Sequence, residues 1–594
     1  MRVDIIGGGP GGLLAAVLLR RLGVADDVRV YERHPAGTTY GWGVVFPEGA
    51  LDQLAQAAPD VQAAVVAAGT TWTHVDVRHQ GYRRRVNGNR FHGIPRAALL
   101  EVLRNAAEEA GARVTFEHTV EDLAAHDGAD LVVGADGVRS VVREAHRDRF
   151  GPELAQSDFV YAWLGTDRVF HDFTYIFRDT PWGVFRAYAY PSGQPWSSLI
   201  VHTSPETWRA SGLASMDETE SSRLFEQIFA QDLEGAAVLS KGAPWTRFPH
   251  LTCSSWHTDR TVLIGDAAHT AHWSIGSGTR LAVEDAIVLA TELAARPGRV
   301  PEALATFERV RRPQVEKFQA AARRSERYFE KMPRYTGFEP DQFAYQLTAR
   351  SWKITHADIA RRDPGFVAGY DAWFHGRATG RPVDVAPSPA FAPLRVGALE
   401  LPNRIVTLSG ARGAGLSLVA TADLSGVPAA PSGGAPAGLR VPVLDSPADY
   451  AELSARALAA GYALVLLELG TDPEAGLTAL KALRAHWPAD RPVAAALPAP
   501  VGTDEAGEAL DTAEHVALAE RLAAAGADAL LVDGVALADA VRNEAGVMVL
   551  ADGGARTRDD VDTVVAAGWA DCCVLYPTAP DRVERESGVL EQED

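Results

Sequence analysis

The feature that most constrains the fold is a glycine-rich turn between an apolar strand-like run and a helix-like segment. The run is Val3–Ile6, and the turn reads Gly-Gly-Gly-Pro-Gly-Gly over residues 7–12. In its G-x-G-x-x-G spacing, Gly7 permits the tight turn, Gly9 lets the backbone approach a pyrophosphate, and Gly12 lets the helix pack on the strand. The helix, with Pro10 in its first turn, would present its amino end to phosphates. The turn therefore predicts a Rossmann-type α/β domain with a bound dinucleotide.

An acidic residue at the end of the second strand-like run narrows the choice of nucleotide. This run, residues 28–31, ends at Glu32, which lies 20 residues beyond Gly12 and is followed by Arg33. A carboxylate at this place accepts hydrogen bonds from ribose hydroxyls and disfavours a 2′-phosphate. We therefore expect FAD or NAD rather than NADP, with Glu32 and Arg33 beside the nucleotide.

Two further motifs favour FAD. Residues 129–140 read as a buried strand that breaks at Asp136-Gly137, and residues 261–269 read as another strand that ends at Gly265-Asp266. The second strand leads into a glycine-rich helix start that contains Gly276 and Gly278. Carboxylates accept hydrogen bonds from hydroxyl groups. Such a group at a strand end suits a ligand with many hydroxyls, such as the ribityl chain of FAD.

With three motifs in this order, residues 1–320 resemble the single-component FAD-dependent aromatic hydroxylases, the family of p-hydroxybenzoate hydroxylase. The resemblance implies that the glycine turn holds the ADP part of FAD, that Asp136 serves the pyrophosphate and that Asp266 binds the ribityl chain. It also implies that Arg96, in the helix start 94–99, helps to hold FAD. NADH would then reduce FAD, and O2 would form a C4a-hydroperoxide that hydroxylates the ring.

The glycine-rich helix start departs from the usual family pattern, because no proline stands between His269 and Gly276. This variant, like the segment 41–46, resembles the aryl-CoA branch of the family. It implies an aromatic CoA thioester as substrate, such as salicylyl-CoA hydroxylated at its 5-position. Two alternatives stay open: a hydroxylase of a free aromatic or polyketide substrate, and a non-catalytic flavin-binding scaffold.

Candidate catalytic residues are less constrained by the pattern. His269 follows a flavin-binding motif, and a neutral histidine can relay the proton of a phenol; a hydrogen-bonded structural role is the alternative. Trp42 lies in a glycine-flanked turn and is either a catalytic-site residue or part of the core or flavin wall. The aromatic stretch 182–190 predicts a sheet floor over the substrate. Within it, Arg186 either meets a carbonyl or CoA phosphate or lies at the surface.

The rest of the chain has a different character. Residues 1–375 form the predicted monooxygenase domain, the Pro- and Gly-rich residues 376–390 predict a linker, and residues 391–594 contain one lysine and alternate helix-like with strand-like runs. Residues 391–406 resemble the opening of Old Yellow Enzyme-type FMN barrels. About 200 residues are fewer than the roughly 250 of a (β/α)8 barrel. We expect a truncated barrel that lacks its second and third units, binds no FMN, and serves packing or homodimerisation.

Composition excludes other classes. A formal charge of −20 disfavours a nucleic-acid partner. The three cysteines form no disulfide or zinc pattern, so no metal is expected and a reducing, cytoplasmic setting fits. The sequence opens on a strand-like run, and no apolar stretch reaches roughly 18 residues, so we expect neither secretion nor a membrane span.

Overall fold

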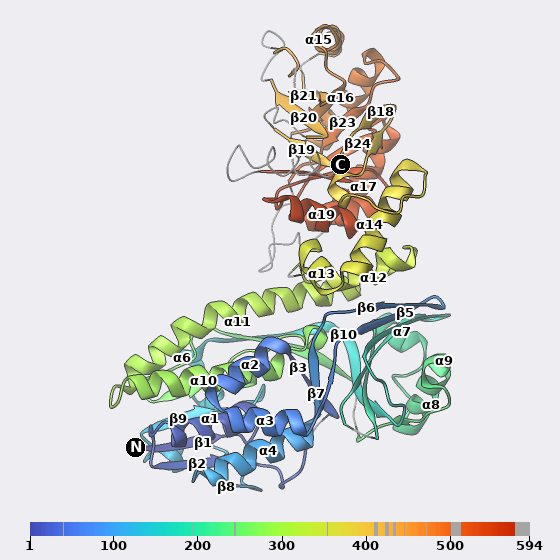
Figure 1. Ribbon diagram of the computed structural model, residues 1–594. Helices are drawn as coiled ribbons and strands as arrows, with labels where there is room; N and C mark the ends of the chain where they lie inside the picture. The colour runs from blue at the N-terminus through green and yellow to red at the C-terminus, as the bar shows by residue number, and fades with distance from the viewer. Residues whose placement is uncertain are drawn as a thin grey trace. The chain divides into compact units, whose positions relative to one another are not determined.

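The computed structural model describes residues 1–576 apart from residues 40, 194, 243–244, 353, 409–413, 422–426, 432–434, 445, 471 and 500–511. Contacts divide the chain into two compact units, Met1–Glu330 and Lys331–Asp594 (Figure 1). In the described part of the chain, no helix is long and apolar enough to cross a membrane.

A five-stranded parallel sheet forms one part of the first unit. Its strands, in spatial order, are β16 (Thr261–Leu263), β9 (Leu131–Gly134), β1 (Arg2–Ile6), β2 (Asp27–Tyr31) and β8 (Arg113–Thr115). The helices packed together beside it are α1 (Pro10–Arg21), α4 (Arg96–Glu109) and α10 (Gly278–Ala295). Ile5 and Ile6 of the central strand point to opposite faces and are both buried, as expected for a strand covered on both faces. The predicted Rossmann-type sheet is confirmed.

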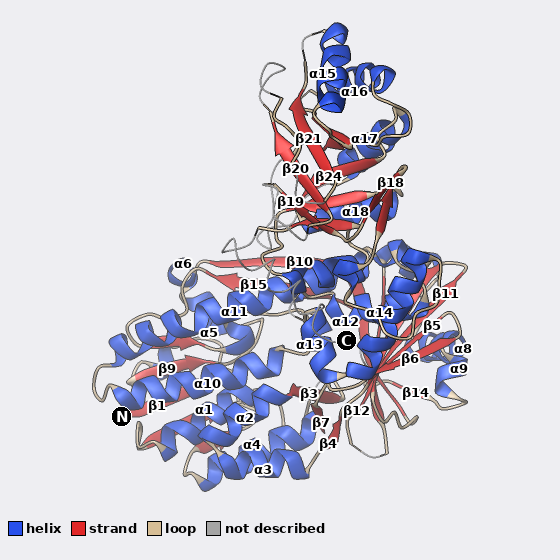
Figure 2. Ribbon diagram, turned by 45° about the horizontal axis from the view of Figure 1, so that its top comes forward, coloured by secondary structure: helices blue, strands red, loops and turns tan. Residues whose placement is uncertain are grey.

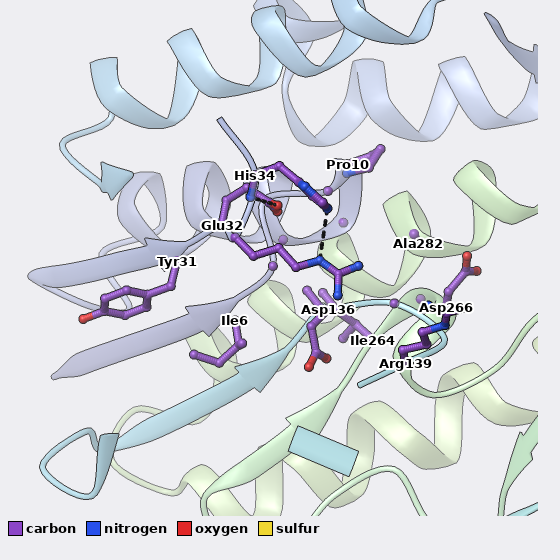
Figure 3. Close-up of a pocket in the computed structure, with 18 of the residues that line it drawn as sticks. Ile6, Pro10, Tyr31, Glu32, His34, Asp136, Arg139, Ile264, Asp266 and Ala282 are labelled. Carbon is purple, nitrogen blue, oxygen red and sulfur yellow. Dashed lines mark hydrogen bonds between the residues drawn. The ribbon is translucent and has the colours of Figure 1, made fainter. Parts of the chain in front are cut away.

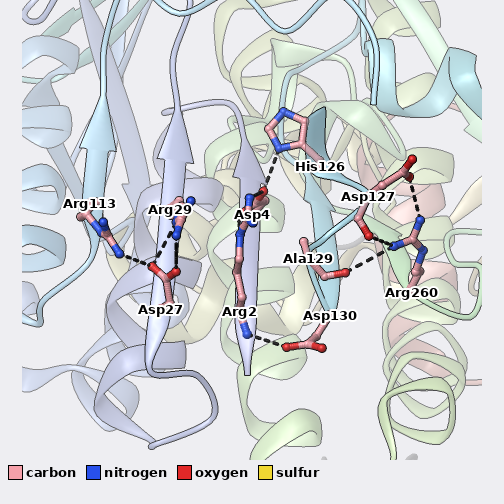
Figure 4. Close-up of polar contacts among 10 residues, drawn as sticks. All are labelled: Arg2, Asp4, Asp27, Arg29, Arg113, His126, Asp127, Ala129, Asp130 and Arg260. Carbon is pink, nitrogen blue, oxygen red and sulfur yellow. Dashed lines mark hydrogen bonds and ion pairs between the residues drawn. The ribbon is translucent and has the colours of Figure 1, made fainter. Parts of the chain in front are cut away.

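The amino ends of these strands are held by charged contacts, on the edge opposite to the glycine turn (Figure 4). Asp27 of β2 accepts hydrogen bonds from Arg29 and from Arg113 of the neighbouring strand β8. The hydrogen bond from Arg29 is the main cause that lowers the pKa of Asp27 to about 2. On β1, buried Asp4 contacts His126 at 2.8 Å. These contacts add to the parallel pairing of the strands at this edge of the sheet.

A mixed eight-stranded sheet forms the other half of the first unit (Figure 2). Its strands, in order, are β14 (Val238–Leu239), β10 (Pro152–Thr166), β13 (Ser197–Thr203), β12 (Gly183–Pro191), β11 (Phe173–Thr180), β5 (Val75–His79) and β6 (Tyr82–Val86), with β15 (Thr246–Cys253) paired to β10. An apolar cluster with α8 (Glu218–Ile228) and α9 (Ala230–Leu233) covers one face. This sheet matches the predicted substrate floor.

A small antiparallel sheet and several further helices complete the first unit. They are the three-stranded sheet β3 (Gly43–Pro47), β7 (Phe91–Pro95) and β4 (Thr70–Trp72), with helices α2 (Glu48–Ala57), α3 (Pro59–Ala67), α5 (Val141–Ala145), α6 (Arg147–Phe150), α7 (Pro205–Ala210) and α11 (Val300–Glu330). Single 3-10 turns are η1 (Ala124–His126), η2 (Gly265–Ala267) and η3 (Trp273–Ile275).

The second unit begins before the segment predicted to be a linker. It opens with η4 (Met332–Arg334), α12 (Pro340–Ala349), α13 (His356–Arg362) and α14 (Pro364–Thr379), followed by η5 (Pro389–Phe391). The Tyr370 hydroxyl of α14 donates to the Ala566 carbonyl, and Gln346 of α12 donates to the Ala567 carbonyl. These buried hydrogen bonds tie the helices to the barrel that follows, and the first residues of the 376–390 segment are helical.

Eight parallel strands close into a barrel. They are β19 (Ile405–Thr407), β20 (Leu416–Ala420), β21 (Ala437–Pro442), β22 (Leu464–Glu468), β23 (Val493–Ala496), β24 (Ala529–Asp533), β25 (Val549–Asp552) and β26 (Cys572–Val574). Outside them lie α15 (Pro447–Ala459), α16 (Pro473–His486), α17 (Ala513–Ala524), α18 (Val535–Glu544) and α19 (Arg558–Ala566), and the hairpin β17 (Leu394–Val396) and β18 (Leu399–Leu401) precedes them.

The barrel-like fold is confirmed, but the expectation that its second and third units are missing is wrong. Strands β20 and β21 are in place. Only eight residues separate β19 from β20, and the described residues on either side of β20 contain no helix. Within the described ranges, the domain is thus shortened around β20, where no covering helix lies, while parallel strand pairing still closes the barrel.

Candidate functional site

A cavity of about 280 Å³ lies at the carboxyl ends of β1, β2, β9 and β16 (Figure 3). Parallel strands end at one edge of the sheet, where ligands of open α/β folds bind. Every residue predicted from the sequence to hold the cofactor, except Gly276, lines this cavity. They are Gly7, Gly9, Pro10, Gly12, Glu32, Arg33, Arg96, Asp136, Gly265, Asp266 and Gly278.

The glycine turn forms the floor of the cavity by close backbone packing. Gly7 has φ +111°, and a Cβ there would lie 2.3 Å from the Ala135 carbonyl oxygen. A Cβ on Gly12 would lie 2.2 Å from the Gly7 oxygen, whereas a Cβ on Gly9 would meet nothing within 4 Å. Helix α1 begins at Pro10, so its unpaired first-turn N–H groups face the cavity. The turn is built for an anion at Gly9.

Glu32 is oriented by two backbone hydrogen bonds. Its carboxylate accepts from the Gly8 N–H at 2.8 Å and from the His34 N–H at 2.9 Å. Each oxygen retains a lone pair for a further donor. Beside it, the Arg33 Nε lies 3.1 Å from the His34 Nε2. Figure 3 shows Glu32 and Tyr31 at one side of the cavity and Asp266 at the other.

Asp136 contributes an oxygen that the protein leaves unbonded. Its Oδ2 accepts from the Val141 N–H at 2.7 Å, and its buried Oδ1 has no hydrogen-bond partner among the described residues. Burial raises the pKa of this carboxyl. An unpaired buried oxygen is costly, which indicates that a ligand or water donates to it.

Asp266 and Arg96 form the other end of the cavity. Asp266 lines the cavity and is otherwise surrounded by protein. This burial raises the pKa of its carboxyl group, and the charges of His269 and Arg96 oppose the increase. Burial lowers the pKa of Arg96, and the charge of Asp266 opposes that change. The Arg96 N–H donates to the Trp42 carbonyl at 3.1 Å. Asp266 and Arg96 do not pair with each other. The carboxylate can therefore accept hydrogen bonds from a polar chain of a ligand, and the guanidinium can donate to it.

His269 lies outside the cavity. It is buried, and its Nε2 lies 2.8 Å from the Asp285 Oδ2, which also accepts from the Gly265 N–H at 2.9 Å. The second oxygen of Asp285 accepts from Arg311. This geometry favours a positioning role, in which His269 and Asp285 fix the turn that carries Asp266.

Trp42 and Gly276 also lie off the cavity lining. The Trp42 ring packs against the mixed sheet, where a Cβ on Gly165 would lie 2.6 Å from it, and the Lys241 Nζ lies 4.1 Å from its centroid. Gly276, at φ +64°, ends the turn η3 that carries Trp273. Trp42 thus supports Arg96 through its carbonyl, and no described contact gives it a chemical role.

Sequence reasoning missed several lining residues. His118 and Thr119 follow β8, and Ala282 lies in the first turns of α10. The first two follow a strand whose neighbour in space is β2, and the sequence alone does not reveal that neighbour. Arg139 also lines the cavity. Its position two residues after Gly137 could have identified it from the sequence.

The lining fits FAD. An open space at Gly9, an oriented carboxylate at Glu32 and an unbonded Asp136 oxygen match a phosphate, a ribose and hydroxyl donors, respectively. The groups present at Arg96 and Asp266 suit a polar chain beyond the phosphates. Apart from residues outside the described ranges, no group of three or more metal-ligating side chains is present.

Known proteins share this sequence pattern. Residues 1–322 match the family described as FAD binding domain. The salicyloyl-CoA 5-hydroxylase of a Streptomyces species is 36% identical over 74% of this chain and 84% of its own length. The 3-hydroxy-4-methyl-anthranilyl-[aryl-carrier protein] 5-monooxygenase of Streptosporangium sibiricum is 36% identical over 62% of this chain and 99% of its own. The solved structure of 2-methyl-3-hydroxypyridine-5-carboxylic acid oxygenase covers 61% of this chain and 97% of its own, with 20% identity and a TM-score of 0.48.

Proposed function

This chain belongs to the family of FAD-dependent aromatic monooxygenases, and from that premise we propose that it hydroxylates an aromatic ring carried on coenzyme A, with NADH as reductant. The observation that carries the proposal is the cavity whose glycine turn, Glu32, Asp136 and Asp266 match the family motifs in one continuous lining. Bound FAD supplies the activated oxygen atom that is transferred to the ring.

The residues of the chain bind and orient the reactants. The turn at Gly9 and the amino end of α1 bind the pyrophosphate, and Glu32 accepts from the ribose. Arg96 and Asp266 hold the polar chain between the phosphates and the flavin ring. The aromatic face of the mixed sheet, including Tyr188 and the facing Trp273, orients the substrate ring and excludes water.

An aryl-CoA substrate is supported by the relative from Streptomyces. The match with the salicyloyl-CoA 5-hydroxylase covers 74% of the chain, more than the first compact unit alone, so it extends into Lys331–Asp594. We therefore propose salicylyl-CoA, hydroxylated at its 5-position, as the first substrate to test. Hydroxylation para to the existing hydroxyl is also the electronically favoured outcome for such a ring.

The test is to incubate the protein with NADH and salicylyl-CoA under air and to measure the mass of the product. The proposal predicts a CoA product heavier by one oxygen atom and substrate-dependent NADH oxidation. Absence of both with salicylyl-, anthraniloyl- and benzoyl-CoA would eliminate coenzyme A esters as the substrate class. Failure of NADH to bleach bound FAD with every ligand would instead favour a non-catalytic flavoprotein.

A second candidate is a ring attached to a carrier protein. It is favoured by the relative from Streptosporangium sibiricum, whose name specifies an aryl-carrier protein and a 5-monooxygenase. Free aromatic acids form the control series. Comparing kcat/KM for one acyl group as free acid, CoA ester and carrier-protein ester separates the three cases, because only the correct carrier contributes binding energy to the transition state.

For the second unit we propose that the barrel carries no FMN. The polar groups at its mouth are engaged with one another: Arg440 donates twice to Glu468, and the Tyr576 hydroxyl donates to Asp552. Asp533 and Asp552 line this mouth together with Arg440 and Arg556, so two carboxylates offset the two cations that a phosphate would need. Denaturation should release one FAD and no FMN per chain; a second flavin would overturn this proposal.

A further inference from the structure

One face of the mixed sheet carries an unusual set of side chains. Along β12, Phe185, Ala187 and Ala189 enter the apolar cluster beneath the sheet. Because side chains alternate along a strand, Arg186, Tyr188 and Tyr190 share the opposite face. The register places His202 of β13 directly across from Arg186, so its side chain lies on that same face.

This face runs from the cofactor cavity to Arg186. At one end, the Tyr190 hydroxyl donates to the Gly43 carbonyl at 3.0 Å, and Tyr190 interacts electrostatically with Arg96 of the cavity. In the middle, Tyr188 packs edge-on against Trp273 at 5.2 Å between ring centroids. Arg186 is four residues from Tyr190, a separation of roughly 13 Å along a strand.

Arg186 is a buried cation that forms no ion pair with any described carboxylate. Its side chain is 2% exposed, and its guanidinium lies 5.0 Å above the Phe159 ring. Its Nε and Nη1 have no hydrogen-bond partner among the described residues. Burial lowers its pKa to about 10, so it remains positive at neutral pH. Arg311, buried to the same degree, contacts both Glu284 and Asp285.

His202 presents a second unpaired polar atom beside this cation. Its Nε2 is buried and has no partner in the described part of the chain. Burial, and then the neighbouring charge of Arg186, hold the pKa of His202 well below its usual value, so the ring is neutral. The ring packs edge-on against Trp273 at 5.1 Å between centroids. Two adjacent, buried polar groups that lack partners among the described residues and are surrounded by aromatic rings indicate a site for a ligand oxygen.

Resting on the aromatic hydroxylase function proposed above, we propose that Arg186 and His202 bind the ring oxygen para to the hydroxylated carbon and hold it as a phenolate. A ring that turns one carbon toward the cofactor cavity turns its para substituent away from it, and neither Arg186 nor His202 lines that cavity. The phenolic O–H bond breaks on binding and its proton goes to bulk water, because Arg186 is already protonated and His202 stays neutral. The retained electron pair increases electron density at the para carbon.

The other titratable groups near the guanidinium do not replace the substrate oxygen. Besides the larger effect of burial, the charges of Tyr188 of β12 and of Tyr328 and Glu330 of α11 raise the pKa of Arg186, and the charges of Arg186 and His272 lower that of His202. The substrate class that follows is an aromatic ring with a hydroxyl para to a free ring position.

The experiment compares FAD-loaded full-length wild type with Arg186→Met, Arg186→Lys and His202→Asn. The paired probes are salicylyl-CoA and benzoyl-CoA, which differ by the hydroxyl alone, and flavin fluorescence reports binding. The wild type should prefer salicylyl-CoA by at least about tenfold, the contribution of a charged hydrogen bond, and should release about one proton per molecule bound. Arg186→Met should lose the preference and the proton release, and Arg186→Lys should keep part of both. An undiminished preference in Arg186→Met would overturn the proposal.

A second probe separates this proposal from the coenzyme A assignment. If neither thioester binds the wild type, the proposed substrate class fails, and 4-nitrophenol tests the oxygen site directly by its visible phenolate absorbance. Ionisation on binding to the wild type but not to Arg186→Met supports the proposal; no difference between them overturns it. Urea unfolding provides the structural control: removing an unpaired cation should leave stability equal or higher, and marked destabilisation of Arg186→Met would indicate a structural role instead.

Discussion

Replacing Gly9 and Gly12 by alanine should have different effects, one on FAD binding and the other on stability. A Cβ on Gly12 would lie 2.2 Å from the Gly7 oxygen and 3.1 Å from the Ala135 Cβ. Gly7 cannot retreat, because it is itself packed on the Ala135 carbonyl. Overpacking of this kind costs about 1–3 kcal/mol. Gly12→Ala should therefore lower the stability of the apoprotein.

Gly9→Ala should leave the stability of the apoprotein unchanged and weaken the binding of FAD. Gly9 has φ −75° and ψ 177°, which any residue adopts, and a Cβ there meets nothing within 4 Å. The same methyl group would occupy the space proposed for the pyrophosphate. A steric cost of about 1–3 kcal/mol corresponds to a roughly 5- to 150-fold loss of affinity.

The assay is urea unfolding of both apoproteins, followed by FAD titration monitored by quenching of flavin fluorescence. Gly9→Ala should unfold at the same urea concentration as the wild type but bind FAD more weakly. Gly12→Ala should unfold at a lower urea concentration than the wild type. Wild-type FAD affinity in Gly9→Ala would refute the placement of the pyrophosphate, and wild-type stability in Gly12→Ala would refute the packing argument.

Three further predictions concern Asp285, its partner His269, and Asp27. Asp285→Asn removes one of the two carboxylates that contact Arg311, and it should lower the free energy of unfolding in urea by less than the cost of an uncompensated buried charge, about 3–5 kcal/mol, because Glu284 keeps its contact with Arg311. His269→Gln should lower FAD affinity without moving the pH profile of kcat; a shifted profile would instead assign His269 to proton transfer. Asp27 has a folded-state pKa of about 2, below its ordinary value of 3.8, so its pairing with Arg29 stabilises the fold above about pH 4, and this contribution is lost as the pH falls towards 2. Because Asp27 is 28% exposed, Asp27→Asn should cost less than about 1 kcal/mol at pH 7, and equal acid sensitivity of wild type and variant would contradict this assignment.

The sequence was most informative where function depends on local chain geometry. Gly9, Glu32 and Asp266 were predicted because a turn, a strand end and a helix start each impose a fixed spacing. Arg186 could be assigned to a strand by alternation, but its burial and its missing partner depend on Phe159 and His202 of other strands.

Non-local pairing also explains the incorrect expectation for the barrel. The described residues on either side of β20 contain no helix, and α15 follows rather than precedes β21, so the helix-then-strand pattern that indicated the later units is missing before both strands. Their place is set by parallel pairing with β19 and β22. His269 illustrates the same limit, because its partner Asp285 lies 16 residues away on α10.

The most direct test of the central claim is turnover of salicylyl-CoA with NADH under ¹⁸O2. The account predicts a hydroxylated CoA ester that carries one ¹⁸O atom, with consumption of one NADH per product. Oxidation of NADH to give only hydrogen peroxide, or a product whose new oxygen comes from water, would contradict it.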